Sequence, residues 1–346
     1  MAVSATGSGV TTPLIPPMGP PPDRCFGASS GFATPAVASP VIPVPPVLPP
    51  PLSSVPVAMA PQLEVSFSCH MGQRRQMEDT THWVELPATT AGGPVTHFAA
   101  VYDGHNGCVA AELAADHVHV ALQHSPHYAT NVGAALVDAL RAVDIAMLEH
   151  SAAVAGSGTT ACIACVRGQE LTVANLGDCR AVLATSDGRT MQLTRDHKVS
   201  CAIETQRILS RGGAAAFGRI DGLSVSRGVG DFEFKTPHGV RAGTDALSNI
   251  AEVSTTPLTS DCACVILASD GLWDKVSNQE AADAVLRYIG PASAAGPSPL
   301  SAGGPAGTPR DTTQMAAQAL VDLAIHRGTS DNVSALILKL RPQWCG

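Results

Sequence analysis

Charged residues and long apolar runs are both scarce in this chain of 346 residues. A membrane-spanning helix needs about eighteen consecutive apolar residues, and no such run occurs, so we expect no membrane partner. Lysine and arginine number 21 against 29 acidic residues, which gives a net charge of −8. Because DNA and RNA are held by a basic field, we expect no nucleic-acid partner either. Hydrophobic residues make up 45% of the chain and charged residues only 14%, which predicts a packed globular protein.

The N-terminus also lacks recognisable targeting signals. No basic region precedes an apolar segment, and Met1 is followed by Ala2 rather than by the glycine that myristoylation needs. The ten cysteines are scattered, and the close pairs Cys162/Cys165 and Cys262/Cys264 lie in apolar runs without zinc ligands at a suitable spacing. We therefore predict reduced, buried thiols and a location in the cytoplasm or nucleus, with an organelle address in the first 60 residues as the alternative.

Residues 1–60 differ in composition from the rest of the chain. They combine proline with Ala, Val, Gly and Ser, and Asp23 and Arg24 are their only charged residues. Because proline removes helix and sheet hydrogen bonds, we predict a disordered or polyproline-II tail, either inert or bound by a proline-recognising partner. Residues 61–342 form the predicted folded domain, with a low-complexity surface loop inserted at about 290–312.

Short apolar runs rich in β-branched residues alternate with helical segments in the folded domain. The predicted strands are 97–102, 160–166, 171–175, 180–184, 264–268 and 333–338, and the predicted helices are 108–123, 132–150, 203–211, 278–288 and 313–326. The short connection between 171–175 and 180–184 predicts a β-hairpin. Strands joined by tight turns, with helices in separate blocks, favour antiparallel sheets covered by helices over a βαβ dinucleotide fold.

Acidic residues stand at the ends of several of these strands and beside a pair of arginines. They are Asp103, Asp178, Asp270, Asp331 and the adjacent Glu78 and Asp79. One Asp-Gly dipeptide alone is an ordinary turn signal. Carboxylates that converge from several buried strands repel one another unless cations lie between them, and Mg²⁺ and Mn²⁺ prefer such oxygen-rich sites. With Arg74 and His105 beside them, these acids predict a centre for hard divalent cations.

Nine short motifs follow one another in the order found in a known family. They are Arg74–Asp79 (RRQMED), Val101–Gly107 (VYDGHNG), Ser157–Ala161 (SGTTA), Ala174–Arg180 (ANLGDCR), Leu193–Lys198 (LTRDHK), Leu223–Arg227 (LSVSR), Gly230–Phe232 (GDF), Ala268–Asp274 (ASDGLWD) and Ser330–Ser334 (SDNVS). Each motif is weak alone, but the ordered set is specific. On these motifs the chain resembles the metal-dependent, type 2C serine/threonine protein phosphatases over about residues 64–341.

The resemblance implies an α+β fold. Its form is a four-layer αββα sandwich, in which two antiparallel sheets are flanked by helices and a binuclear metal centre lies at one edge. The resemblance implies that Asp103 bridges two ions and that the Gly104 carbonyl, Asp270 and Asp331 are the other protein ligands of the first ion. Glu78 would bind the second ion, and Asp79 would hold a metal-bound water. Asp178 and Asp270 would form a weaker third site. The cofactor would be Mn²⁺ or Mg²⁺.

The function implied is hydrolysis of phosphoserine and phosphothreonine in protein substrates, by direct attack of a water held between two metal ions. Arg74 would bind the substrate phosphate, in preference to Arg75, because its spacing to Glu78 matches the family. His105 would be the general acid that protonates the leaving alkoxide. Beside the ligands we expect Thr160, Asn332 and Asp274, whereas we interpret His197 as structural. No covalent phosphoenzyme is needed, and we predict a monomer.

Two positions depart from the family pattern without removing a ligand: Asn106 stands where glycine or alanine is usual, and Thr159 where serine is usual. Residues 212–224 contain no tryptophan, so nothing supports the docking to plant hormone receptors known from one branch of the family. We predict that residues 198–222 form a flap beside the site. Arg207, Arg211 and Arg219 in this flap either attract phosphopeptides or form a solvated basic face.

Three alternative functions stay open at this point. Cys69–Arg75 (CHMGQRR) has the C-x-x-G-x-x-R spacing of cysteine-dependent phosphatases, in which an arginine opens a helix and the helix dipole activates the thiol. The segment that follows is a poor helix start, which argues against Cys69 as a nucleophile. The chain could instead be a catalytically silent phosphoprotein-binding module of the same fold, or a hydrolase of another phosphoester.

Overall fold

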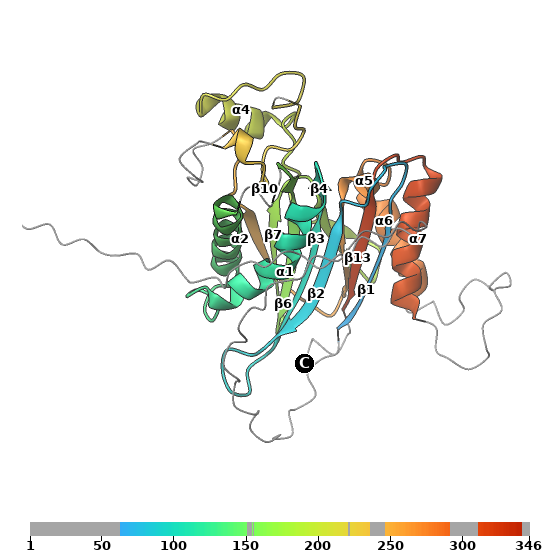
Figure 1. Cartoon of the computed structure of the whole chain (residues 1–346). Helices are drawn as coiled ribbons and strands as arrows, with labels where there is room; N and C mark the ends of the chain where they lie inside the picture. Colours follow the sequence, from blue (N-terminus) through green and yellow to red (C-terminus); the bar gives the residue numbers. More distant parts are fainter. Residues whose placement is uncertain are drawn as a thin grey trace, which may run out of the picture.

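The structure is a computed structural model that describes residues 63–150, 154, 156–220, 222–235, 246–290 and 311–340. The predicted tail, residues 1–60, lies outside the described residues, and so does nearly all of the predicted loop at 290–312. The remainder folds into the layers drawn in Figure 1.

Two five-stranded antiparallel sheets form the centre of the molecule. Sheet I contains, in order, β1 (Glu64–His70), β13 (Val333–Lys339), β12 (Cys262–Ala268), β8 (Arg180–Thr185) and β9 (Thr190–Gln192). Sheet II contains β11 (Glu252–Pro257), β7 (Glu170–Leu176), β6 (Ala161–Arg167), β3 (Thr96–Tyr102) and β2 (Thr80–Leu86). A small third sheet joins β10 (Val229–Gly230), β5 (Gly158–Thr159) and β4 (Gly104–His105).

Helices cover the outer face of each large sheet, as Figure 1 shows. Sheet II is covered by α1 (Val109–His124) and α2 (Val132–Glu149), and sheet I by α6 (Asn278–Ile289) and α7 (Thr312–His326). Local signals explain where these helices begin: Asn131 and Asp311 cap α2 and α7, and Ser277 with Glu280 forms a capping box on α6. The predicted αββα sandwich of antiparallel sheets is therefore confirmed.

Three apolar layers hold the sandwich together. Strand β3 illustrates the arrangement, because successive side chains of a strand point to opposite faces. Phe98, Ala100 and Tyr102 pack under α1 and α2, whereas Ala99 and Val101 pack between the two sheets. The third layer fills the space between sheet I and helices α6 and α7. The interior strands are buried on both faces, so they are continuous apolar runs in the sequence.

The predicted hairpin between residues 171–175 and 180–184 is wrong. Strand β7 pairs with β6 and β11 in sheet II, whereas β8 pairs with β12 and β9 in sheet I. The short segment between them crosses from one sheet to the other instead of turning back beside β7. This crossing places Asp178 at the end of the sandwich, between the two sheets.

The cysteine pairs lie inside strands, as predicted. Cys162 and Cys165 are buried on opposite faces of β6, and Cys262 and Cys264 are buried in β12. All four are free thiols. Among the described helices, none is long and apolar enough to cross a membrane.

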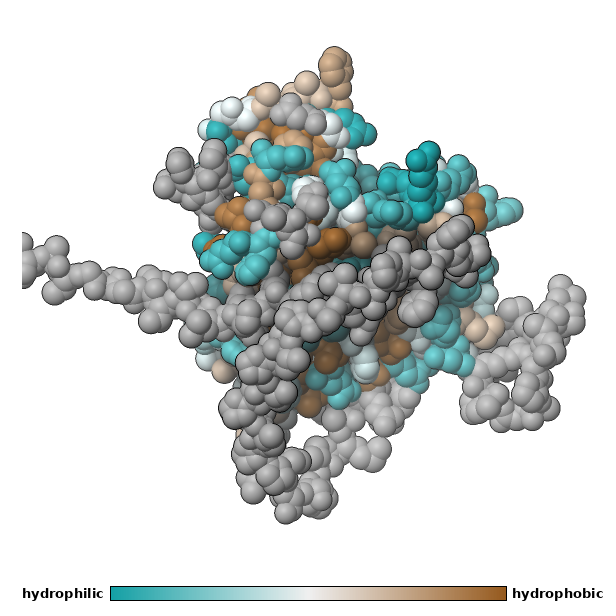
Figure 2. All heavy atoms as spheres, in the orientation of Figure 1, coloured by the Kyte–Doolittle hydropathy of each residue, from teal (hydrophilic) through white to brown (hydrophobic). Residues whose placement is uncertain are grey.

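The predicted flap stands apart from the sandwich in Figure 1. It carries α4 (Ala202–Ser210) and has a small core of its own around Val199, Ile208 and Ile220. In Figure 2 the part of the surface around α4 mixes hydrophobic and hydrophilic side chains, and the apolar Ile203, Leu209 and Phe217 are exposed there.

Candidate functional site

The antiparallel pairing brings the acidic residues to one end of the sandwich, which we name the acid end. Strands β3, β7 and β12 finish there, and Asp103, Asp178 and Asp270 directly follow them or come two residues later. Strands β2 and β13 begin there, because they run antiparallel to β3 and β12, so that Asp79 and Asp331 precede them at the same end. The strand-end pattern of the sequence thus becomes one cluster in space.

Three of these acids form the centre of the cluster. One carboxylate oxygen from each of Asp103, Asp178 and Asp270 lies within 4.8 Å of the others. Burial raises the pKa of all three carboxyl groups above the ordinary value for aspartate, and negatively charged neighbours raise them further. For Asp103 the neighbours are Asp79, Asp270, Asp178 and Asp331. Divalent cations would relieve this repulsion, and carboxylate oxygens are the donors that Mg²⁺ and Mn²⁺ take, so the residues fit such ions.

Glu78 and Asp79 are held against this centre by hydrogen bonds. The Asn332 side chain accepts from the Glu78 N–H at 2.7 Å and donates to backbone carbonyls on the same loop. The Gly107 N–H donates to Glu78 Oε1 at 2.6 Å, and the Ser269 hydroxyl donates to Asp79 Oδ2 at 2.8 Å. Asn332, which was predicted to lie beside the metal ligands, therefore fixes the loop that carries Glu78 and Asp79.

Gly104 lies where no larger residue would fit. A Cβ atom built on it would lie 2.4 Å from the carbonyl oxygen of Glu78, well inside van der Waals contact. Asn106, two residues later, has a φ of 56°, in the left-handed region that glycine and asparagine tolerate best. This conformation is compatible with asparagine, which stands here in place of the glycine or alanine that is usual in the family.

Arg74 reaches the acid end from the loop that follows β1. Its Nη2 lies 2.7 Å from Asp331 Oδ2, and its Nη1 lies 3.9 Å from Glu78 Oε2. The side chain is about half exposed, at 50%. A guanidinium in this position faces solvent beside the carboxylates, where an incoming phosphate could meet its remaining N–H groups.

His105 also lies at the acid end, in contact with a buried acid. Its Nε2 lies 2.9 Å from Oδ1 and 2.7 Å from Oδ2 of Asp231. The Asp231 side chain is fully buried, whereas that of His105 is 23% exposed. Burial alone lowers the pKa of His105, but the hydrogen bond and the negative charge of Asp231 outweigh it and raise that pKa above the ordinary value.

Thr160 and Asp274 complete the residues named from the sequence. The Thr160 hydroxyl accepts from the Asp103 N–H at 3.1 Å, and the Thr160 N–H donates to the Asp103 carbonyl at 2.9 Å, so Thr160 fixes the backbone of Asp103. Asp274 contacts the ammonium of Lys198 at 2.8 Å. Lys198 Nζ also lies 3.8 Å from Asp270 and 3.9 Å from Asp178.

Sequence reasoning missed two residues of the site, Asp231 and Lys198. Both stand in motifs that resemble the family, Gly230–Phe232 and Leu193–Lys198. Their contacts are made with residues far away in the sequence, however, and the neighbouring residues give no sign of them.

The structure does not support Cys69 as a nucleophile. Burial raises the pKa of its thiol, and the charge of Asp79 adds to that effect, so the reactive thiolate is disfavoured. Cys69 lies in β1, and the chain then passes through a loop at residues 71–79 into β2. Arg75 therefore opens no helix, and the arrangement that activates a catalytic thiol is missing from these described residues.

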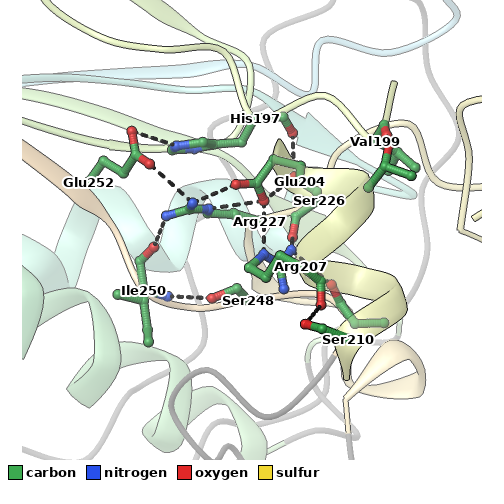
Figure 3. Close-up of polar contacts among 12 residues, drawn as sticks. His197, Val199, Glu204, Arg207, Ser210, Ser226, Arg227, Ser248, Ile250 and Glu252 are labelled. Atoms are coloured by element: carbon green, nitrogen blue, oxygen red, sulfur yellow. Dashed lines mark hydrogen bonds and ion pairs between the residues drawn. The ribbon is translucent and has the colours of Figure 1, made fainter. Parts of the chain in front are cut away.

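A second buried polar cluster attaches the flap to the sandwich, as Figure 3 shows. Glu204 of α4 pairs with Arg227 at 2.5 Å and with Arg207 at 3.0 Å, and Arg227 also contacts Glu252 of β11. His197 is fully buried here: its Nδ1 accepts from the Gly177 N–H, and its Nε2 lies 3.4 Å from Glu252. The position of His197 agrees with its interpretation as structural.

The prediction for Arg207 is wrong in both of its forms. Its side chain is only 17% exposed, and it donates to the carbonyl oxygens of Ser226 and Ala246 as well as pairing with Glu204. It is therefore neither part of a solvated basic face nor open to a phosphopeptide. Arg211 and Arg219 are exposed, so for them the prediction stays as it was.

Comparisons with known proteins agree on one family. A family model described as Protein phosphatase 2C matches residues 63–333. Probable protein phosphatase 2C 22 of Arabidopsis thaliana is 32% identical over 284 residues, which cover 79% of this chain and 67% of the plant protein. Probable protein phosphatase 2C 42 of Oryza sativa subsp. japonica is 30% identical over 268 residues, covering 66% of this chain and 74% of the rice protein.

Solved structures show the same fold. The crystal structure of serine-threonine phosphatase 2C from Toxoplasma gondii has a TM-score of 0.64 and 20% sequence identity to this chain. The similarity covers 83% of this chain and 97% of the Toxoplasma chain.

Proposed function

Because the chain belongs to the protein phosphatase 2C family, we propose that it hydrolyses phosphoserine and phosphothreonine in proteins with the help of divalent cations. The plant relatives are named as probable protein phosphatases, which supports a phosphatase activity here. The observation that carries the metal dependence is the meeting of Asp103, Asp178 and Asp270, whose oxygens lie within 4.8 Å of one another although burial and mutual repulsion disfavour their charge.

The oxygen ligands for two ions come from the residues gathered at the acid end. Asp103 would bridge both ions, with the Gly104 carbonyl, Asp270 and Asp331 on the first and Glu78 on the second, and Asp79 would act through a water. When bound, Mn²⁺ or Mg²⁺ supplies a nucleophilic water near neutral pH and neutralises charge on the phosphoryl group.

A weaker third ion would use Asp178 and Asp270, and here Lys198 enters the proposal. Its ammonium already lies 3.9 Å and 3.8 Å from these carboxylates and 2.8 Å from Asp274. A third cation would have to compete with this lysine for the same oxygens, which supports weak binding at that site.

The chain's own side chains orient the substrate and handle its proton. Arg74 would hold two phosphate oxygens through its forked N–H groups and so align the phosphorus for in-line attack. In hydrolysis the water oxygen bonds to phosphorus while the ester P–O bond breaks. The serine or threonine alkoxide that leaves then takes a proton, which we assign to the imidazolium of His105. His105 suits this task because Asp231 raises its pKa.

The alternatives receive less support. A cysteine-dependent mechanism would need a thiolate at Cys69, whose pKa is raised, and a helix where the chain instead forms a loop. A silent binding module of the same fold would tolerate the loss of metal-binding acids, yet every predicted acid is present and lies at the acid end. A hydrolase for other phosphoesters would use the same residues, because they recognise little beyond the phosphate.

The proposal is tested by measuring phosphate release from a phosphothreonine peptide with Mn²⁺ or Mg²⁺ and then with excess chelator. We expect activity that requires metal and falls by at least about a hundredfold in Asp103→Asn. Asp322→Asn is the matched control, since Asp322 is an exposed aspartate on α7, and it should keep full activity. Cys69→Ser should do the same.

Two outcomes would overturn the proposal in different ways. Activity that survives chelation and is lost in Cys69→Ser would replace the metal mechanism with a covalent one. Binding of phosphopeptide with no turnover, whether Mn²⁺, Mg²⁺ or chelator is present, would identify a binding module.

We further propose that the protein is a monomer and that it is located in the cytoplasm or nucleus, with an organelle address as the alternative. Gel filtration measures the oligomeric state, and imaging of the tagged full chain shows the location.

A further inference from the structure

Asp231 has a backbone conformation that is uncommon for residues other than glycine. Its φ is 51° and its ψ is 47°, in the left-handed region that residues with a side chain rarely adopt. Its carboxylate is fully buried, and both oxygens lie within hydrogen-bond distance of His105 Nε2, at 2.9 Å and 2.7 Å. Strained and buried positions of this kind persist when the surrounding structure holds them in place, and they concentrate at functional sites.

The small third sheet is built so that the Asp231 side chain can reach His105. Its middle strand β5 pairs on one side with β4 and on the other with β10, so Gly158 stands opposite both His105 and Gly230. A Cβ atom on Gly158 would lie 2.0 Å from Asp231 Oδ2. Because this glycine has no side chain, the carboxylate occupies the space next to β5 and touches the imidazole.

A buried acid on α2 fixes the loop that carries Asp231. Asp144 accepts from the Gly230 N–H at 2.8 Å and from Lys235 Nζ at 2.8 Å and 3.0 Å. The same lysine donates to the Gly228 carbonyl, and the Asn249 side chain donates to Asp144 as well. Asp144 and Lys235 thus hold the backbone on both sides of Asp231, so its left-handed conformation is part of a rigid arrangement.

We propose that Asp231 is a positioning residue for His105: it accepts the Nε2–H of the imidazole and so leaves Nδ1 to donate a proton to the departing alkoxide. This inference rests on the proposed function of the acid end and adds to it the residue that orients the acid. Nε2 is bonded to Asp231 inside the protein, and the His105 side chain is 23% exposed, so the proposal assigns contact with the substrate to the second ring nitrogen, Nδ1. The arrangement follows the general logic by which a buried carboxylate fixes the tautomer and orientation of a catalytic histidine.

The first test compares two aryl phosphates whose leaving groups differ in acidity. Phenol, with a pKa of about 10, needs protonation as it leaves, whereas nitrophenol is far more acidic and needs little help. In Asp231→Asn we expect kcat for phenyl phosphate to fall about ten- to a hundredfold, kcat for p-nitrophenyl phosphate to change less than about threefold, and KM to stay unchanged for both. The exposed neighbour Glu233 provides the matched control, Glu233→Gln, which should behave as the wild-type protein.

A double-mutant cycle with His105→Ala tests whether Asp231 acts on kcat through His105. If Asp231 acts through His105, adding Asp231→Asn to His105→Ala causes no further loss. If Asp231→Asn lowers kcat equally for both aryl phosphates, or if the double variant has a lower kcat than His105→Ala, Asp231 only stabilises the fold. If His105→Ala lowers kcat equally for both aryl phosphates, His105 is not the general acid, and the proposed function fails at that point. The two failures are therefore distinguishable.

A second measurement needs no change at Asp231. Nitrogen-15 NMR of the histidine rings distinguishes the two neutral tautomers, and the signals of His105 are those that disappear in His105→Ala. We expect the proton of neutral His105 on Nε2, because Asp231 accepts it there. A neutral ring protonated on Nδ1 would overturn the proposal, even if the Asp231 variant did not fold.

Discussion

Buried charge dominates this protein at the scale of single residues. At the acid end, the pKa values of Asp103, Asp178 and Asp270 are raised because the carboxylates are buried or partly buried and lie close to one another. Each of these acids could be predicted, since it stands next to the end of an apolar strand. Asp231 and Lys198 stand in recognised motifs, but their roles could not be predicted, because their partners are distant in the sequence: His105 is 126 residues from Asp231, and Asp274 is 76 residues from Lys198.

The buried histidine of the flap cluster predicts a dependence of stability on pH. Burial, and then the positive charge of Arg227, lower the pKa of His197 from 6.5 to about 4 in the folded protein. As pH falls below 6.5 the unfolded chain binds a proton there and the folded chain does not, so the free energy of unfolding falls until about pH 4. The facing groups Glu204 and Glu252 have lowered pKa values and titrate mainly at lower pH.

The measurement is denaturant unfolding of the wild-type protein and of His197→Asn, whose amide oxygen can still accept from the Gly177 N–H. Between neutral pH and a pH of about 5, we expect the wild-type protein to lose about 2 kcal/mol more stability than the variant. Parallel curves for the two proteins would show that His197 is not held neutral by the fold.

At the scale of secondary-structure elements, the position of a strand in its sheet determined whether the sequence predicted it. The six strands predicted from the sequence are the interior ones, β3, β6, β7, β8, β12 and β13. Within the two large sheets, the four strands that were not predicted are the outermost ones, β1, β2, β9 and β11, and the two-residue strands of the small third sheet were not predicted either. An interior strand is buried on both faces and forms an apolar run, whereas β11 alternates between half-buried and exposed residues and β2 is polar along much of its length.

The connection between β7 and β8 shows a limit of local reasoning. Its length allows a hairpin, and nothing in the three connecting residues 177–179 indicates that the next strand joins the other sheet. The choice is made by pairing partners that lie far away in the sequence, β12 for β8 and β6 for β7. The functional consequence is that Asp178 lies between the sheets, beside Asp103 and Asp270.

The polar cluster around Glu204 attaches α4 to the sandwich, and Arg207 is part of that cluster. Replacing Arg207 with methionine keeps the length of the side chain but removes its ion pair with Glu204 and its bonds to two carbonyl oxygens. We expect the free energy of unfolding to fall by roughly 1–3 kcal/mol, because hydrogen bonds of a charged group are lost in a half-buried site. Arg211→Met, at the exposed residue that follows the same helix, should change the free energy of unfolding by less than about 0.5 kcal/mol. Equal effects of the two changes would mean that the cluster in Figure 3 does not hold the flap.

At the scale of the whole molecule, the three apolar layers are built from described residues between Leu63 and Leu340. We therefore predict that a chain shortened to residues 61–342 keeps the denaturant midpoint and the phosphatase activity of the full chain, since the layers that stabilise the sandwich are all retained. A lower midpoint, or a loss of activity with peptide substrates, would show that the removed residues contribute to the fold or to the site.

If the acid end is a cation centre, the number of Mn²⁺ ions that each chain binds can be counted. Electron paramagnetic resonance measures free Mn²⁺ during titration, without any need for activity. We expect about two ions bound to each wild-type chain and to Asp322→Asn, and weaker binding of fewer ions to Asp103→Asn, because a carboxylate proposed to hold both ions is lost. No binding by the wild-type chain, or unchanged binding after Asp103→Asn, would contradict it.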